Sequence, residues 1–264
     1  MIRQQYIGIT GFMSQAEVNS VLSSLPTDFG SFKNRKIMVG MLVSGKTIKG
    51  IPNKWPNRYP TPDAIPSIFV NDPRVINLVH YNTKEESPKE IINELCLIED
   101  ACGPYHHGFQ LNMVWPKAQM ISDWQQSGFE RNKKTIVLQC GGRAMAELNH
   151  SPKALAEKLK EYEGVVDYVL LDPSGGIGIP FDPAYALQCL DVIENENLPT
   201  IHLGIAGGLS PETLPNLLPP ILEHFPKVCI DAEGRLRTKE DNLDLQIANE
   251  YINIAENLFR QYAK

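Results

Sequence analysis

The stretch Val165–Asp182, VVDYVLLDPSGGIGIPFD, combines a strand pattern with the features of a ligand-binding loop. Its apolar run Val169–Leu171 is too short for a helix and is typical of a strand buried on both faces. The run ends at Asp172, and the loop that follows contains three glycines, among them Gly176 and Gly178. An acid at the carboxyl end of a strand, followed by such a loop, favours a functional site over an ordinary strand-to-helix connection.

The composition indicates a soluble globular protein. The chain has 264 residues, of which 42% are hydrophobic and 21% charged, and its net charge of −6 gives no reason to expect nucleic-acid or membrane partners. The N-terminus shows no secretory leader pattern, and no apolar run approaches the roughly 18 residues of a spanning helix. Five scattered cysteines without C-x-x-C spacing indicate reduced thiols rather than a disulfide framework or a zinc site. We therefore expect a cytoplasmic protein.

Strand-like and helix-like segments alternate along the whole chain. The expected strands are Tyr6–Thr10, Ile37–Val43, Val75–His80, Gly108–Val114, Thr135–Gln139, Asp167–Leu171, Thr200–Ile205 and Val228–Asp231. Eight β–α units in a chain of this length predict a (β/α)8 TIM barrel, with residues 1–264 forming a single domain. An open doubly wound sheet is the alternative, but the regular spacing of the units favours closure.

Several helix starts carry recognisable signals. Ser87 and Glu90 form a capping-box pattern, and Ser151-Pro152 and Ser210-Pro211 each place an N-cap serine before a proline. Further helices are expected over Ser14–Leu25 and Leu243–Tyr262. The segment Trp55–Pro66 is rich in proline and is predicted to be a long loop, with a short helix around Asp63–Val70.

Active sites of such barrels lie at the carboxyl ends of the strands. This rule selects as candidate acid–base groups Asp172, Asp231, Glu233 and His80. The same rule selects as candidate substrate-binding residues Gln110, Asn112, Gln139, Arg143 and Lys46. A metal site built from Asp231, Glu233 and His80 lacks supporting ligand spacing, so no metal is predicted.

Glycine turns follow the sixth, seventh and eighth strands. Backbone amides of such turns bind phosphate in many barrels, often after strands seven and eight. The candidate phosphate-binding residues are Gly176, Gly178, Gly207, Gly208, Gly234 and Arg235. A tight turn followed by a standard helix cap is the alternative interpretation of Ala206–Ser210.

Three of these stretches resemble one known family. YIGIT of the first strand, LLDPSGGIGIPFD and IAGGLSPETL are similar to the corresponding motifs of phosphoribosylanthranilate isomerase. The resemblance implies a barrel enzyme with a phosphosugar-like ligand and no cofactor. That family converts an aminoaldose into an aminoketose with a general acid and a general base. By resemblance Asp172 stands at the position of the acid, whereas Ile7 occupies the position of the catalytic cysteine base.

The resemblance breaks down at two further places. The family presents a serine and glycine amides to phosphate after strand eight, where this chain has Glu233 and Gly234. A carboxylate there repels phosphate unless a cation such as Arg235 intervenes; otherwise Glu233 binds an amine or hydroxyls and no phosphate binds. The family's arginine for the substrate carboxylate has no clear equivalent, and Lys46 and Lys49 are the nearest candidates.

The leading hypothesis is a divergent enzyme of this type that acts on a phosphorylated sugar or a related small polyol. The expected reaction is isomerisation or another proton transfer next to a carbonyl, with a small-molecule substrate and a possible homodimer. A non-catalytic ligand-binding or assembly barrel is the first alternative. The family reaction with a substitute base is the second, with His80 or Cys140 among the candidates for that base.

Overall fold

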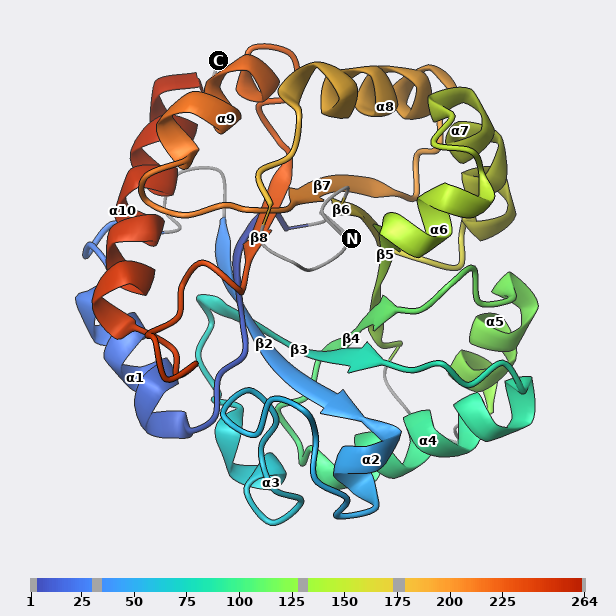
Figure 1. The fold of residues 1–264 in the computed structure, drawn as a ribbon, viewed down its shortest axis with the longest axis vertical. Coiled ribbons are helices and arrows are strands. Elements are labelled where there is room, and N and C mark those ends of the chain that lie inside the picture. Colours follow the sequence, from blue (N-terminus) through green and yellow to red (C-terminus); the bar gives the residue numbers. More distant parts are fainter. Residues whose placement is uncertain (1–3, 30–34, 128–132, 173–178, 263–264) are drawn as a thin grey trace.

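The computed structural model describes residues 4–29, 35–127, 133–172 and 179–262, and its centre is a closed parallel β-barrel (Figure 1). The strands are β1 Tyr6–Thr10, β2 Lys36–Ser44, β3 Val75–Asn82, β4 Gly108–Asn112, β5 Thr135–Gly141, β6 Tyr168–Asp172, β7 His202–Ala206 and β8 Cys229–Ala232. Each strand pairs in parallel with the next one in the sequence, and β8 pairs with β1 to close the barrel. The predicted (β/α)8 fold is therefore confirmed.

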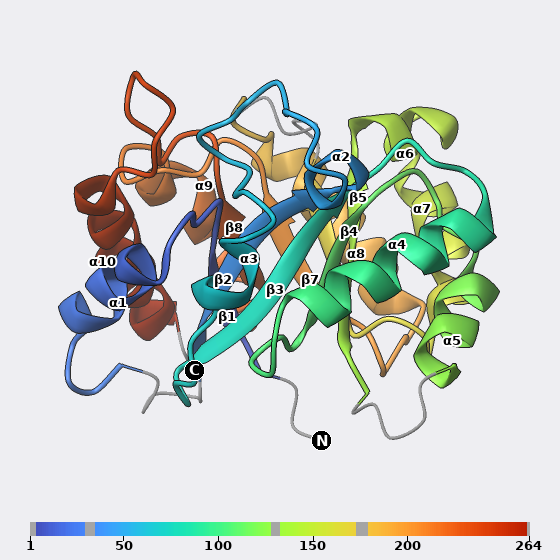
Figure 2. The same cartoon turned by 90° about the horizontal axis from the view of Figure 1, so that it is seen from below.

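Helices surround the barrel on its outer side (Figures 1 and 2). They are α1 Gln15–Ser24, α2 Gly45–Ile48, α3 Ile65–Ile68, α4 Pro88–Ala101, α5 Ala118–Gln126, α6 Gly142–Glu147, α7 Pro152–Leu159, the 3-10 turn η1 Lys160–Tyr162, α8 Pro183–Asn195, α9 Leu214–Leu222 and α10 Leu245–Tyr262. In α10 the buried residues recur at helical spacing, at Ala248, Ile252, Ala255 and Phe259. This stripe packs against the barrel, as its periodicity predicts.

Strand β1 shows how side-chain alternation separates two layers. Ile7 and Ile9 belong to the apolar cluster between the strands and the helices, whereas Tyr6 belongs to the cluster inside the barrel. Position 8 also faces the interior, because a Cβ on Gly8 would lie 2.7 Å from Asp231 Oδ1. Successive residues of a strand point to opposite faces, so residues 6, 8 and 10 share the inner face.

The barrel interior changes from apolar to polar along the strands. The inner apolar cluster consists of Tyr6, Met38, Ile76, Leu78, Val137, Tyr168, Leu170, Ala206 and Cys229. Two residues further along their strands, the inner positions carry polar side chains, namely His80, Gln139, Asp172 and Asp231. The apolar layer fills the amino-terminal part of the barrel, and the polar layer forms the floor of its carboxyl-terminal mouth.

Two expected helix starts differ from the structure. The helix after β7 begins at Leu214 and not at Ser210-Pro211, because Thr213 Oγ1 donates to the Gly208 carbonyl and accepts from the Ser210 N–H, which holds a turn there. Ser87 caps α4 through the Glu90 N–H, but its own N–H donates to Glu85. The capping box predicted from Ser87 and Glu90 is therefore only half formed.

Candidate active site

The polar side chains at the carboxyl ends of the strands surround one small hollow of about 50 Å³. This end of the barrel faces upward in Figure 2, on the side of α2 and α6. The lining residues are His80, Asn112, Gln139, Asp172, Ala206, Gly207, Gly208, Leu209, Asp231, Ala232, Glu233, Gly234 and Arg235. The structure thus brings all four candidate acid–base residues to the same hollow, although they come from three different strands and the loop after β8.

Asp231 is the most strongly perturbed carboxyl group at the mouth. Its two carboxylate oxygens each lie 3.1 Å from Thr10 Oγ1, and Oδ2 accepts from Gln110 Nε2 at 3.1 Å. The pKa of Asp231 is raised to about 7, mainly by burial and also by the nearby carboxylates of Glu233 and Asp172, against the lowering effect of the hydrogen bonds from Gln110 and Thr10. A carboxyl group with a pKa near 7 can gain and lose a proton at neutral pH.

Asp172 is connected to Asp231 through two glutamine side chains. Gln110 Nε2 donates to Gln139 Oε1 at 3.1 Å, and Gln139 Nε2 donates to Asp172 Oδ2 at 3.0 Å. These four side chains come from β4, β5, β6 and β8 and are all buried. The two carboxyl groups are therefore held by one continuous hydrogen-bonded network.

His80 lies between two side-chain amides. Its Nδ1 is 3.3 Å from Gln110 Nε2, and its Nε2 is 3.1 Å from Asn112 Nδ2. Burial lowers the pKa of His80, although the carboxylates of Glu233 and Asp172 act in the opposite direction. The ring is therefore neutral near pH 7 and contributes hydrogen bonds rather than a positive charge.

Glu233 has a counter-ion that the sequence did not indicate. Arg58, in the long loop after β2, places Nη1 2.9 Å from Glu233 Oε1. The same guanidinium binds Asp241 through Nη2 at 2.6 Å and through Nε at 2.8 and 2.9 Å. Arg235, which the sequence suggested for this role, is exposed and lines the hollow. No local pattern reveals Arg58, because it is 175 residues from Glu233 in the chain.

A second arginine, Arg237, fixes the loop after β8 to the end of β1. Its Nη2 donates to the carbonyls of Thr10 at 3.2 Å and Gly11 at 3.0 Å. Gly11 has a φ of 105°, and a Cβ there would collide with this guanidinium. The contact holds the β1 end beside Asp231, so Arg237 supports the site without lining the hollow.

The turn after β7 requires both of its glycines. Gly207 and Gly208 have φ values of 111° and 66°, in the left-handed region, and a Cβ on Gly208 would collide with Pro180. The Gly208 carbonyl accepts from Thr213 Oγ1 at 2.8 Å, and the Gly207 carbonyl accepts from the Phe181 N–H at 3.4 Å. Both glycines line the hollow at the barrel mouth.

The other predicted binding residues lie around this hollow or outside it. Arg143 lines an adjoining hollow of about 300 Å³, which shares Asn112, Gln139 and Asp172 with the first. Lys46 lies apart, in a groove of about 500 Å³ after β2 and β3 that contains none of the candidate acid–base residues. Gly234 is exposed at the rim. The remaining two candidates, Gly176 and Gly178, lie outside the described residues.

The position of the family's base, Ile7, and one candidate substitute base, Cys140, both face away from the mouth. Ile7 is fully buried in the outer apolar layer, on the opposite face of β1 from Thr10. Cys140 lies in the same outer layer, and burial raises the pKa of its thiol well above the ordinary value. Neither position presents a side chain to the hollow that Asp231 and Asp172 share.

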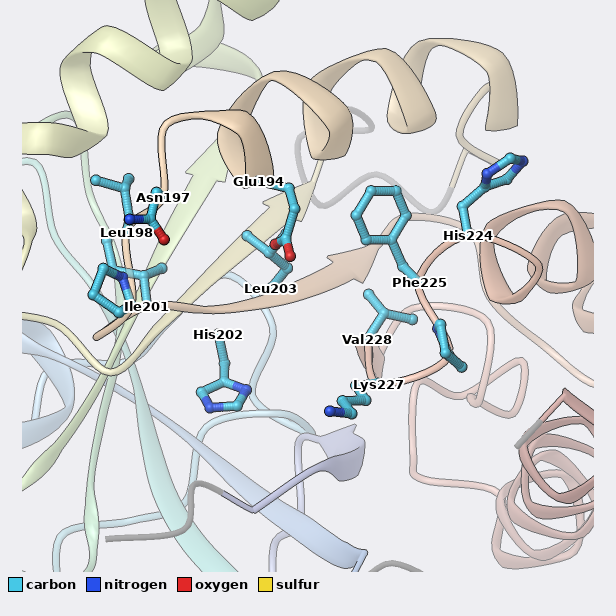
Figure 3. Close-up of a pocket in the computed structure, with 12 residues that line it drawn as sticks. Glu194, Asn197, Leu198, Ile201, His202, Leu203, His224, Phe225, Lys227 and Val228 are labelled. Atoms are coloured by element: carbon cyan, nitrogen blue, oxygen red, sulfur yellow. The ribbon is translucent and has the colours of Figure 1, made fainter. Parts of the chain in front are cut away.

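A cavity of about 370 Å³ lies at the opposite end of the barrel, where β7 and β8 begin (Figure 3). His202, Leu203 and Val228 are among its lining residues, and none of the predicted site residues reaches it. Among the described residues, no group of three or more His, Cys, Asp or Glu side chains is arranged to hold a metal ion. None of the described helices is both long and apolar enough to cross a membrane.

The sequence and structure comparisons find similarity to phosphoribosylanthranilate isomerases. No protein-family profile matches the chain. A stretch of 124 residues is 32% identical to N-(5'-phosphoribosyl)anthranilate isomerase of Methanocella arvoryzae; it covers 45% of this chain and about half, 54%, of that relative. Phosphoribosylanthranilate isomerase from Thermus thermophilus has the same fold, with a TM-score of 0.63 and 15% identity over 96% of this chain and 99% of the other.

Monomers generated from the dimeric phosphoribosylanthranilate isomerase of Thermotoga maritima also share the fold, with a TM-score of 0.57 and 16% identity over 96% of this chain and 99% of the other. At such low identities these two structures establish the barrel fold alone. The partial sequence match and the shared barrel fold make this chain similar to phosphoribosylanthranilate isomerases, and the sequence match spans about half of the relative's length.

Proposed function

We propose that the chain is an isomerase-type enzyme that transfers a proton next to the carbonyl of a phosphorylated sugar or a related small polyol. One observation carries this proposal: Asp172 and Asp231 line the same hollow and are joined through Gln139 and Gln110. A proton transfer of this kind needs two groups, one that removes a proton and one that supplies a proton to the substrate. Two carboxyl groups at one hollow meet that requirement without a cofactor.

Asp231 takes the place of the family's cysteine base in this proposal. Its pKa of about 7 allows it to accept and release a proton at neutral pH, and its contacts with Thr10 and Gln110 fix its orientation. Asp172 acts on the other side of the hollow, and the neighbouring Asn112 and Gln139 amides bind substrate hydroxyls. The N–H groups of Gly207 and Gly208 and the Arg235 guanidinium bind the phosphate, while Arg58 offsets the charge of Glu233.

The fluorescence of phosphoribosylanthranilate tests the family reaction directly, since that fluorescence decays as the compound isomerises. Under the proposal, Asp172→Asn and Asp231→Asn each abolish turnover of the true substrate, and Lys84→Ala in the separate groove leaves it unchanged. Full activity of both asparagine variants would remove the two carboxyl groups from the mechanism.

A thermal-shift series with sugar phosphates and with the matching unphosphorylated sugars tests the ligand class. A ligand at 100 times its Kd stabilises the fold by about 2.7 kcal/mol, which is a readily measured shift. The proposal expects a shift with a phosphorylated sugar that Arg235→Ala weakens. A shift with the free sugar alone would assign a neutral polyol and refute the phosphate site.

A non-catalytic ligand-binding barrel is the second candidate, because Ile7 stands where the family has its base and points into the outer core. In that case ligands stabilise the protein, but no C–H exchange occurs in any of them. The two candidates therefore give opposite results when a stabilising ligand is tested for turnover.

A further inference from the structure

Two amide side chains connect the carboxyl groups of the candidate site. Gln110 Nε2 lies 3.1 Å from both Asp231 Oδ2 and Gln139 Oε1, and Gln139 Nε2 lies 3.0 Å from Asp172 Oδ2. The exposed fractions of these four side chains are between 1% and 5%. Water therefore has little access to these hydrogen bonds, which together form an amide bridge between the two carboxyl groups.

The two hydrogen bonds from Gln110 compete with each other. Both leave the same NH2 group, which has two hydrogens and also lies 3.3 Å from His80 Nδ1, so three acceptor atoms share two N–H bonds. The Gln110 carbonyl oxygen is buried and has no hydrogen-bond partner among the described residues. When Asp231 is ionised, it attracts the Gln110 N–H more strongly, and the donation to Gln139 Oε1 weakens. A less engaged Gln139 carbonyl makes its own NH2 a poorer donor to Asp172, because hydrogen bonds in a chain polarise one another.

Protonation of Asp231 has the opposite effect. Gln110 then donates more strongly to Gln139, and Gln139 donates more strongly to Asp172. The Asp172 carboxylate is also among the charges that raise the pKa of Asp231. The other titratable groups that act on Asp231 are Glu233 in the loop after β8, Tyr6 on β1 and Tyr251 on α10. None of these three belongs to the amide bridge, but the titratable ring of His80 on β3 contacts it, with Nδ1 3.3 Å from Gln110 Nε2.

We propose that Gln110 and Gln139 are positioning residues through which the protonation of Asp231 changes the hydrogen bond that Asp172 accepts. A proton gained at Asp231 then strengthens the contact at Asp172, so the two carboxyl groups of the candidate acid–base pair act as a linked pair. The catalytic meaning of this coupling rests on the proposed function, but the coupling itself needs no substrate. It can therefore be measured on the free protein.

An NMR titration of the whole chain tests whether the hydrogen bonds through Gln110 and Gln139 link the two carboxyl groups. The 13C signal of the Asp231 carboxyl group gives its titration midpoint, and the 15N signals of the Gln139 side-chain amide are followed in the same samples. We expect the Gln139 signals to shift at the Asp231 midpoint, although Gln139 does not touch Asp231. Gln110→Met should abolish that response while Asp231 still titrates, and Gln119→Met on the surface of α5 should leave it unchanged.

A second variant covers the case in which Gln110→Met does not fold. Gln139→Met interrupts the bridge at its other amide, and the 13C signal of Asp172 should then no longer respond at the Asp231 midpoint. A wild-type Gln139 amide that ignores the Asp231 midpoint would overturn the proposal. So would a response that survives in Gln110→Met, because it would show that charge alone acts through space. If the NMR response is present but the protein turns over no substrate, the proposed function is refuted, whereas the coupling through Gln110 and Gln139 still holds.

Discussion

Replacing Asp231 with asparagine should change how the stability of the protein depends on pH. Burial raises the pKa of Asp231 from 3.8 to about 7 in the folded state. This is a difference of about three pKa units, and each unit corresponds to about 1.4 kcal/mol, so the total effect is about 4 kcal/mol. Asp231 is 5% exposed, so solvent screening does not reduce this figure much.

The sign follows from the direction of the shift. A carboxyl group whose pKa is raised on folding is protonated more readily in the native state than in the unfolded chain. Its favourable contribution is complete below pH 3.8, decreases as the pH rises, and is lost once the pH exceeds about 7. Between pH 5 and pH 8 the expected loss of unfolding free energy from this one group is about 2–3 kcal/mol.

Urea unfolding of the wild type and of Asp231→Asn at pH 5 and pH 8 measures this effect. Asparagine does not titrate, so the variant should gain about 2–3 kcal/mol relative to the wild type on going from pH 5 to pH 8. Glu212→Gln, at an exposed carboxylate after β7, serves as the control and should show no such gain. A constant difference between Asp231→Asn and the wild type at both pH values would refute a raised pKa at this position.

Three further substitutions test the surroundings of the site. Ile7→Cys should bury its thiol in the outer layer, so thiol reagents should modify no more groups than in the wild type and turnover should not rise above the wild-type level. A newly reactive thiol would contradict the orientation of β1. Gly8→Ala would place a Cβ 2.7 Å from Asp231 Oδ1 and 2.8 Å from Met38 Cε. This crowding should lower the free energy of unfolding, measured by chemical denaturation, by about 1–3 kcal/mol. Unchanged stability would show that the barrel interior has room for a methyl group at this position. Arg58→Ala removes charged hydrogen bonds to Glu233 and Asp241 and should lower the free energy of unfolding by about 1.5–3 kcal/mol. An unaltered melting temperature would mean that this residue does not hold the loop after β2.

The fold was predictable because the pattern of hydrophobic residues along the chain marks which segments form strands and which form helices. Apolar runs such as Val169–Leu171 mark strands that are covered on both faces, and the predicted ends of β1 agree with the structure to the residue. The helix after β7 was predicted too early, because Thr213 and not Ser210 closes the preceding turn. Local signals identified the serine, but the choice between two neighbouring caps depends on the hydrogen bond to the Gly208 carbonyl.

In the candidate site, the two strand-end carboxyl groups were predictable from the sequence, but the residues that support them were not. The barrel rule selects Asp172 and Asp231 because each ends a strand, and the structure places both at one hollow. Their supporting contacts come from distant parts of the sequence. Arg58 lies in a proline-rich loop without regular spacing, and Thr10 reaches Asp231 only because β1 and β8 become neighbours when the barrel closes. Such pairings depend on closure and leave no trace in local sequence.

The most direct test of the account is C–H exchange in deuterated water, followed by proton NMR on the sugar phosphate that stabilises the protein most. The wild type should exchange the hydrogen next to the carbonyl, and Asp231→Asn and Asp172→Asn should each abolish the exchange. Exchange at the wild-type rate in both variants would contradict the assignment of these two carboxyl groups as the acid–base pair.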